Sequence, residues 1–248
     1  MWALLLLVFV IVGVHLFEYN RSIQEYTIAQ PATLDRHDQL RSLLYEKTPI
    51  PVEIGSLPWR PEVVAKSNWS VTVGPEGSEV YMSASQWLTE KERPALLNGP
   101  ELAEEMEFST GLSDLNESRA WWWLPGLRDV TVGILEKGAV LDDGLSWISA
   151  ERQWIGCSYG GPLTVWLVHS RYRRYLPTDV ENPWTLTVGE APWIGRVQYI
   201  EVVVKPGWCL GLPAHWGYAV KSEEEAWWWR SDQVSAASLG LEMFKELL

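Results

Sequence analysis

The sequence predicts a mainly β protein, a sandwich or barrel with a few flanking helices, behind an apolar amino-terminal segment. Short segments rich in β-branched and aromatic residues recur about every eight to twelve residues, separated by Gly and Pro. Apolar residues make up 47% and charged residues 21% of the 248 positions, which is the balance of a globular chain. Tryptophan is unusually frequent, with 17 Trp against 9 Tyr and 4 Phe.

Charge and cysteine content exclude several classes of protein. The chain has 20 basic and 32 acidic side chains, a formal net charge of −12, and such a chain repels the phosphates of nucleic acid. No nucleic-acid partner is therefore predicted. Cys157 and Cys209 are too few for a disulfide-stapled fold or a multi-cysteine zinc module. Neither has an adjacent His or Lys to lower its pKa, so no catalytic cysteine is predicted.

The amino terminus is predicted to be a membrane anchor. Residues 1–17 carry no charged side chain, and in a helix they extend about 26 Å, near the lower limit for spanning a bilayer. No Lys or Arg precedes the run and no small-residue cleavage site follows it, which favours an uncleaved single-pass anchor over a signal peptide. The topology stays open: the downstream arginines favour a cytoplasmic domain, whereas Asn20, Asn68 and Asn116 lie in glycosylation sequons.

The chain beyond the anchor divides into three predicted parts. Residues 18–62 are interpreted as a tether with a short helix near residues 35–45. After that helix, four closely spaced prolines favour an extended, helix-free path. Residues 63–230 are predicted to form the β domain. Residues 231–248 are predicted to form a helix packed on that domain, since Ser231 is a plausible cap and the apolar residues that follow lie on one helical stripe.

The predicted elements of the domain follow in order. Strands at residues 70–73 and 79–82 flank a Gly-Pro-Glu-Gly turn, Ser85 is expected to cap a short helix, and Pro100 is expected to open another. The remaining predicted strands are residues 120–124, 130–135, 146–149, 163–169, 185–188, 197–204, 209–212, 217–221 and 226–230.

The most informative stretch is residues 197–230, VQYIEVVVKPGWCLGLPAHWGYAVKSEEEAWWWR. It predicts a strand, a turn at Pro206-Gly207, a second strand, a corner from Pro213 to His215, and a third strand from Trp216. This order resembles the distal half of a cupin-like, JmjC-type domain, in which the corner region carries the last metal-binding histidine. Residues 154–177 are similar to the middle segment of that family. The resemblance covers about residues 120–240 and implies a double-stranded β-helix, or jelly roll.

The same resemblance exposes what the chain lacks. Active members hold Fe(II) with a His-x-Asp/Glu pair and a distal His, leaving positions open for 2-oxoglutarate and oxygen. None of the four histidines here begins such a pair. Aligning the corner places Tyr218 at the distal histidine position and His215 three residues earlier. The degenerate motif comprises Pro206, Gly207, Pro213, His215, Trp216 and Tyr218.

The resemblance therefore implies a non-catalytic member without a cofactor. His169 and His215, with Glu201 and Asp179, are the group that the sequence offers for a metal, and a structural role for each histidine is the competing interpretation. Degenerate domains with this corner, a Trp triplet and an amino-terminal anchor resemble membrane proteins of large DNA viruses of algae and protists. That resemblance implies a virion component or a protein of a host endomembrane.

Three functional hypotheses follow from the sequence. The first is a non-catalytic single-pass membrane protein that presents the domain as a structural or interaction module to a protein partner, with no oligomeric state predicted. The second is a membrane-anchored Fe(II)/2-oxoglutarate oxygenase with atypical ligands. The third is a glycan-binding domain that uses Trp platforms at residues 121–123 and 227–229.

Two groups of surface contacts are predicted. Arg171, Arg173 and Arg174 form a basic cluster that meets lipid phosphate or an acidic partner, or is simply a solvated loop. Alternate residues of a strand face opposite sides, so each Trp triplet sends side chains both to the core and outward. Core filling, with a helix covering the outer face, is the interpretation that explains most of these side chains. Trp122 and Trp228 are the candidate surface contacts, directed at a ligand or at a bilayer interface.

Overall fold

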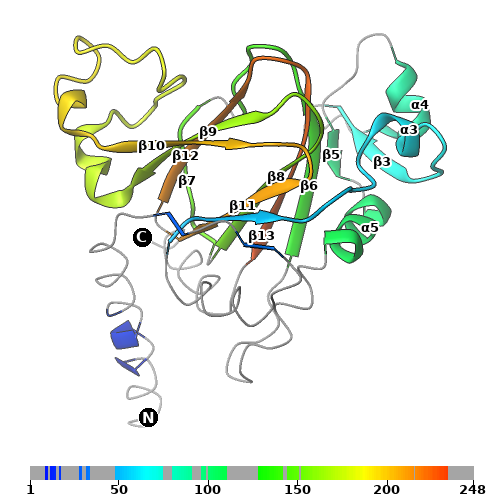
Figure 1. The fold of residues 1–248 in the computed structure, drawn as a ribbon, viewed down its shortest axis with the longest axis horizontal. Helices are drawn as coiled ribbons and strands as arrows, with labels where there is room; N and C mark the ends of the chain where they lie inside the picture. The colour runs from blue at the N-terminus through cyan, green and yellow to red at the C-terminus, as the bar shows by residue number, and fades with distance from the viewer. Residues whose placement is uncertain are drawn as a thin grey trace.

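The computed structural model describes part of the chain, and its structure is mainly β with short helices (Figure 1). This confirms the predicted class. The described residues are 9–10, 12–14, 17, 28–29, 32–33, 48–74, 80–90, 96–98, 100–110, 128–141, 144–150, 152–214 and 216–233.

Two sheets form the centre of the molecule. The larger has the order β1-β2-β11-β8-β13-β6 and is antiparallel except between β1 and β2. Its strands are β1 (Ala32–Thr33), β2 (Ile50–Glu53), β6 (Arg128–Leu135), β8 (Arg152–Gly160), β11 (Trp208–Pro213) and β13 (Ala226–Gln233). The smaller sheet is antiparallel, with the order β10-β9-β12-β7. Its strands are β7 (Ser146–Trp147), β9 (Leu163–His169), β10 (Tyr199–Val204) and β12 (Trp216–Ser222).

The two sheets pack on one another through a shared apolar core. Ile155 and Leu210 from the larger sheet and Val165 and Tyr218 from the smaller one belong to the same buried cluster. We call this cluster the interior core. Side chains along a strand point alternately to the two faces of its sheet. The face of each sheet that points away from the interior core is therefore covered by other parts of the chain.

Helices and a small third sheet lie beside the larger sheet. The third sheet has the order β4-β3-β5, and Figure 1 shows α3, α4, α5 and β3 together on one side of the molecule. The elements are α3 (Pro61–Val64), β3 (Ser70–Val73), β4 (Val80–Ser83), α4 (Ala84–Thr89), β5 (Leu96–Asn98) and α5 (Pro100–Thr110). Helix α5 begins at Pro100 as predicted. The predicted cap at Ser85 is wrong: Ser83 has the extended backbone that an N-cap needs, and its Oγ accepts a hydrogen bond from the Gln86 N–H.

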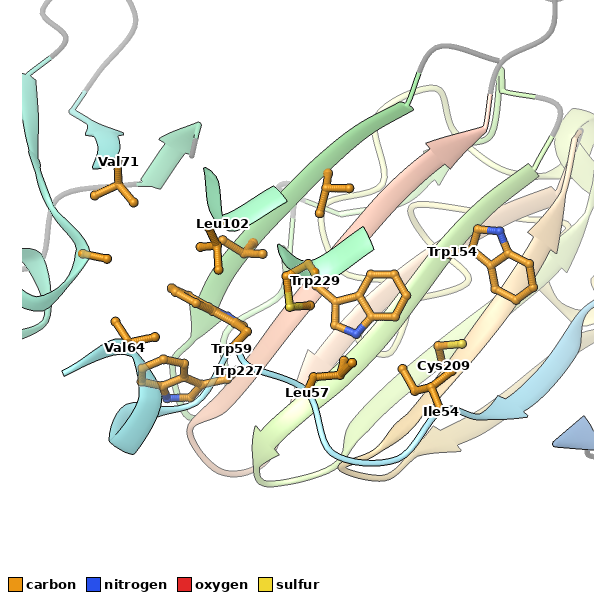
Figure 2. Close-up of a cluster of buried hydrophobic side chains, with 14 of the residues drawn as sticks. Ile54, Leu57, Trp59, Val64, Val71, Leu102, Trp154, Cys209, Trp227 and Trp229 are labelled. Carbon is orange, nitrogen blue, oxygen red and sulfur yellow. The ribbon is translucent and has the colours of Figure 1, made fainter. Parts of the chain in front are cut away.

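The residues predicted as the end of a tether belong to the domain instead. Ile50, Val52, Leu57 and Trp59 are almost completely buried, and the Trp59 indole N–H donates to the Gly133 carbonyl at 3.1 Å. Figure 2 shows Leu57 and Trp59 gathered with Trp227 and Trp229 in one apolar cluster. We call this cluster the outer core of the larger sheet. The prolines do keep this path extended, but an extended path is also what strand pairing requires, and β2 pairs with β11.

Two further predictions are corrected, and one strand was not predicted at all. Strand β8, which lies inside the larger sheet between β11 and β13, was not predicted, because its glycines and polar residues lack a strand pattern. Residues 185–188, predicted as a strand, form turns and irregular structure. Strand β13 continues to Gln233, so the first three residues of the predicted carboxyl-terminal helix lie in a sheet. The rest of that helix, the predicted strand at 120–124 and the predicted helix near 35–45 lie outside the described residues.

Tryptophans in the sheets lie against glycines of the neighbouring strands. In the antiparallel register Trp229 is opposite Gly156, Trp228 is opposite Gly133, and Trp154 is opposite Gly211. A Cβ atom at these three glycines would lie 2.2, 2.8 and 2.6 Å, respectively, from the nearest atom of the indole ring. Each indole therefore occupies the space that a side chain would fill on the next strand. This pairing accounts for three of the tryptophans in the larger sheet.

Only a few residues of the predicted anchor are described. Phe9, Val10, Val12, Val14 and Phe17 are helical, and their apolar side chains are exposed. Within the described part of the chain, no helix combines the length and the apolar character needed to cross a membrane. The remainder of residues 1–17 lies outside the described part.

Candidate functional site

The degenerate motif forms the connection between the two sheets. The turn at Pro206 and Gly207 takes the chain from β10 in the smaller sheet to β11 in the larger one. Gly207 has a φ of 82°, a conformation that favours glycine. Its N–H donates to the Cys157 carbonyl, and its own carbonyl accepts from the N–H groups of Ile54 and Gly55. The turn is thus fastened both to β8 and to the segment after β2.

The corner after β11 leads to β12 as predicted. Strand β11 ends at Pro213 and β12 begins at Trp216, which confirms the order of strand, turn, strand, corner and strand. His215 lies outside the described residues. Trp216 is 1% exposed, and its backbone carbonyl accepts a hydrogen bond from the Ile148 N–H.

Tyr218 occupies the position that the resemblance assigns to the distal metal-binding histidine. It is 3% exposed and belongs to the interior core. Its cross-strand neighbours are Leu167 on β9 and Ser146 on β7. Its hydroxyl accepts a hydrogen bond from Arg230 Nη1 at 3.3 Å. The phenol is therefore held among an aliphatic side chain, a serine and a guanidinium.

A polar group that the sequence reasoning missed lies at the same end of the interior. Strand alternation places Arg230 and Asp232 on the side of β13 that carries Trp228, and Trp228 belongs to the interior core. Gln153 on β8 is opposite Asp232 and donates to its Oδ1 at 2.5 Å. The available signal was the spacing of two charged residues at positions i+2 and i+4 from Trp228. Because the predicted strand ended at residue 230, Asp232 was not assigned to the same strand face as Trp228.

His169 has a local structural role. It lies at the end of β9, is 2% exposed, and its Nδ1 accepts a hydrogen bond from the Arg171 N–H at 3.2 Å. This contact caps the 3₁₀ helix η2 (Ser170–Tyr175). The imidazole also meets the Trp216 ring edge to face, with a centroid distance of 5.1 Å.

Two members of the candidate metal group, His169 and Glu201, lie on opposite faces of the smaller sheet, and His215 lies outside the described residues. His169 is in register with Trp216 of the interior core, whereas Glu201 is in register with Trp166, which packs on the other face of the sheet. Their side chains therefore point to opposite faces. Glu201 instead accepts a hydrogen bond from the Trp184 indole N–H at 2.7 Å, and Asp179 is exposed. Among the residues that the structure describes, no three His, Cys, Asp or Glu side chains form a group able to hold a metal.

The two thiols are buried on opposite faces of the larger sheet. Cys157 belongs to the interior core and Cys209 to the outer core. Burial raises the pKa of Cys157 to about 12, and it raises the pKa of Cys209 as well. The Cys157 thiol donates to the Gly161 carbonyl at 3.3 Å. Both side chains are therefore protonated thiols at neutral pH, in a state that does not attack electrophiles.

Of the predicted surface contacts, Trp228 is buried, whereas the three arginines of η2 lie at the surface. Trp227, Trp228 and Trp229 are 1%, 7% and 1% exposed, so the predicted surface contact at Trp228 is wrong and this triplet presents no indole platform. Trp228 belongs to the interior core between the two sheets, and Trp227 and Trp229 belong to the outer core, where the Trp59 and Trp227 ring centroids are 4.7 Å apart. Trp122 lies outside the described residues. Arg171, Arg173 and Arg174 are exposed on η2.

Compared with known proteins, the chain matches no family model and no curated protein. The cupin-like and viral resemblances therefore stay predictions, and any function rests on the geometry described above.

Proposed function

We propose that this chain is a single-pass membrane protein that presents a degenerate double-stranded β-helix as a non-catalytic structural or interaction module. The proposal joins the apolar amino-terminal segment to the β domain and gives the domain no chemical step. The viral resemblance adds the setting, a virion membrane or a host endomembrane.

The pairing of the strands supports the double-stranded β-helix. Of the eight strands from β6 to β13, the first pairs with the last, β7 with β12, β8 with β11, and β9 with β10. This nested pattern is that of one long antiparallel hairpin wound into two sheets. The sheets then join β13 to β8 and β12 to β9, which closes the winding. Jelly rolls of eight strands share this organisation.

The surroundings of Tyr218 carry the non-catalytic part of the proposal. An Fe(II) site of the oxygenase type needs imidazole and carboxylate ligands that converge on one point. At the distal position this chain has a phenol whose hydroxyl accepts from Arg230. Its neighbours across the sheet are Leu167 and Ser146, neither of which binds iron. The guanidinium beside the phenol adds a positive charge, which opposes a cation at the same place.

Iron binding tests this part directly. The full chain, purified without oxygen in the presence of Fe(II) and then passed through a desalting column, is expected to retain no stoichiometric iron. The matched variant is a His169→Ala, His215→Ala double substitution, which is expected to give the same metal content as the wild type. One iron per chain in the wild type, lost in the double variant, would overturn the proposal in favour of the oxygenase.

Alkaline extraction tests the anchor. In sodium carbonate the full chain is expected to stay in the membrane pellet, because the 17 uncharged residues of the proposed anchor correspond to about 26 Å in a helix. A Val10→Arg, Val12→Arg variant is expected to move to the supernatant. Release of the wild-type chain would contradict the single-pass anchor.

A further inference from the structure

The chain makes a long excursion between β9 and β10, and this excursion covers the outer face of the smaller sheet. We call residues 170–198 the β9–β10 segment. It contains η2 and a second 3₁₀ helix, η3 (Ile194–Arg196). Tyr172, Tyr175, Trp184 and Ile194 of the segment pack against a buried cluster that includes Trp166. Figure 1 shows the segment in yellow, on the side of the molecule opposite α3, α4 and α5.

The sequence of η2, Ser-Arg-Tyr-Arg-Arg-Tyr, sorts its side chains by the three-residue period of a 3₁₀ helix. Tyr172 and Tyr175 fall on one side and pack toward the sheet, with their ring centroids 6.5 Å apart. Arg171 and Arg174 fall on another side, which faces solvent. The Tyr172 hydroxyl donates to Gln198 Oε1 at 2.6 Å, which ties η2 to the end of the segment.

The arginines of the segment stack on aromatic rings. Arg173 lies over Trp147 at 5.0 Å, Arg174 over Tyr175 at 4.8 Å, and Arg196 over Trp193 at 4.7 Å, measured from Cζ to the ring centroid. A guanidinium that lies over a ring can still donate from its N–H groups to an anion. Arg174 uses one of them, because its Nη2 donates to the Tyr175 hydroxyl at 2.8 Å. Stacking also restricts the side chain before any anion arrives, which reduces the entropy lost on binding.

The charge of the segment contrasts with that of the chain. Residues 170–198 contain four arginines and three acids, a net +1, in a chain of net charge −12. One of those acids, Glu190, accepts hydrogen bonds from the Thr187 N–H and hydroxyl, which lower its pKa and keep its carboxylate charged. The segment is therefore slightly positive in an otherwise acidic chain, and its arginines gather on η2 and η3.

Exposed apolar side chains accompany these arginines. Trp193 is 53% exposed, Val188 is 69% exposed, and Tyr199, the first residue of β10, is 53% exposed. Arginine with exposed tryptophan and tyrosine is the composition that proteins place at the boundary between lipid headgroups and acyl chains. An acidic protein partner would use the charges but would not require the isolated exposed Val188 and Trp193.

We propose that the β9–β10 segment is a membrane-contact surface that lays the domain on a bilayer of anionic lipid. Arg173, Arg174 and Arg196 bind headgroup phosphates, while Trp193 and Val188 enter the interfacial layer. This inference rests on the proposed function, because the proposed anchor is what keeps the segment near a bilayer. It gives the anchored domain a preferred orientation in place of free motion.

A single fluorophore tests the contact. Cys157 and Cys209 are buried, and burial raises the pKa of both thiols. A cysteine introduced by Val188→Cys is therefore labelled selectively with a polarity-sensitive dye. The labelled full chain is placed in nanodiscs of phosphatidylcholine, with or without about 30% phosphatidylserine. The emission is expected to shift to shorter wavelength with phosphatidylserine, and about 0.5 M NaCl is expected to reverse the shift through screening.

The charge variants decide the outcome. Arg173→Gln, Arg174→Gln and Arg196→Gln together are expected to lower the ratio of engaged to free domain roughly a hundredfold, at about fivefold per arginine. The matched control, Lys66→Gln, Lys137→Gln and Lys205→Gln, removes the same charge from exposed lysines elsewhere and is expected to keep the shift. Near-ultraviolet circular dichroism verifies that both variants fold.

Two results would overturn the proposal: the same emission with and without phosphatidylserine, or an equal loss in the lysine control. The second would mean that net charge alone acts. Flotation of the unlabelled chain with pure phosphatidylcholine vesicles reports the anchor separately, so failure of the anchor and failure of the contact surface are distinguishable.

Discussion

The outer faces of the two central sheets use aromatic residues in different ways. On the outer face of the larger sheet, Trp59, Trp227 and Trp229 are at most 1% exposed. Arg152, whose guanidinium lies over Trp154 of the same cluster at 5.9 Å, is itself 1% exposed. On the smaller sheet, Trp147 is only partly buried and carries the guanidinium of Arg173, and Trp193 of the covering segment is half exposed.

The covering segments explain this difference. The larger sheet is covered by apolar residues from the chain around β2 and from α3 to α5, which exclude water from the indoles. The smaller sheet is covered by a segment whose inner side is aromatic and whose outer side is basic. The same residue type is thus packing material on one face and part of a surface on the other. Local sequence does not distinguish the two, because both stretches are rich in tryptophan.

The largest effect expected from this contrast is on stability. Trp59→Ala removes a fully buried indole from the outer core and is expected to lower the free energy of unfolding by about 3–5 kcal/mol. Trp193→Ala removes a half-exposed indole and is expected to cost less than about 1 kcal/mol. Urea denaturation followed by circular dichroism measures both. Equal losses of unfolding free energy would show that the indoles on the two faces are buried to the same extent, which would contradict the contrast.

The next effect concerns the glycines beneath the tryptophans. Gly156→Ala puts a Cβ atom 2.2 Å from Trp229 Nε1, so the indole must move in a packed core, at an expected cost of about 1–3 kcal/mol. Gly189→Ala is the control, since its Cβ would meet only Thr187 Oγ1 at 3.7 Å. Thermal denaturation compares the two variants. A Gly156→Ala protein as stable as the Gly189→Ala protein would remove the close indole contact as the reason for this glycine.

The smallest effect is on the pH dependence of stability. Burial raises the pKa of Cys157 from 9.0 to about 12, so between these values the unfolded chain releases a proton that the folded chain keeps. Stability is therefore expected to fall as pH rises through this interval. Cys157→Ala is expected to make the decline shallower, as measured by urea denaturation from pH 8 to pH 10. An unchanged slope in the variant would show that the thiol is not shielded as described.

The strand pattern could be predicted where β-branched residues and turns alternate. The strands at residues 70–73 and 163–169 were predicted with the bounds that the structure gives, because Val, Thr and Leu runs bounded by glycine, proline or serine satisfy the local rule. Strand β8 was missed because Gly156 and Gly160 interrupt its pattern. Its place in the sheet comes from β11 and β13 on either side, and from the indole that covers Gly156. Such a strand is defined by partners more than fifty residues away in sequence.

The candidate site shows the same division. The turn at Pro206-Gly207 and the corner after Pro213 were readable, since Pro and Gly act on their own backbone. The hydrogen bond from Arg230 to Tyr218 was not readable, because it joins β13 to β12 across the interior. The outward direction predicted for Trp228 was wrong for a related reason. Alternation says that neighbouring residues face opposite sides, but not which side another sheet will cover.

By itself, the sequence determined the features that depend on neighbouring residues: the mainly β class, most strand positions, the turns, the acidic charge and the absence of a His-x-Asp/Glu pair. The tertiary structure alone decided that residues 48–62 belong to the domain and that Trp227 to Trp229 are buried. It also decided that His169 and Glu201 point to opposite faces. The physical reason is that burial and convergence are properties of pairs of segments. A local pattern states what a segment is able to pack, and only its partner in space decides what it does pack.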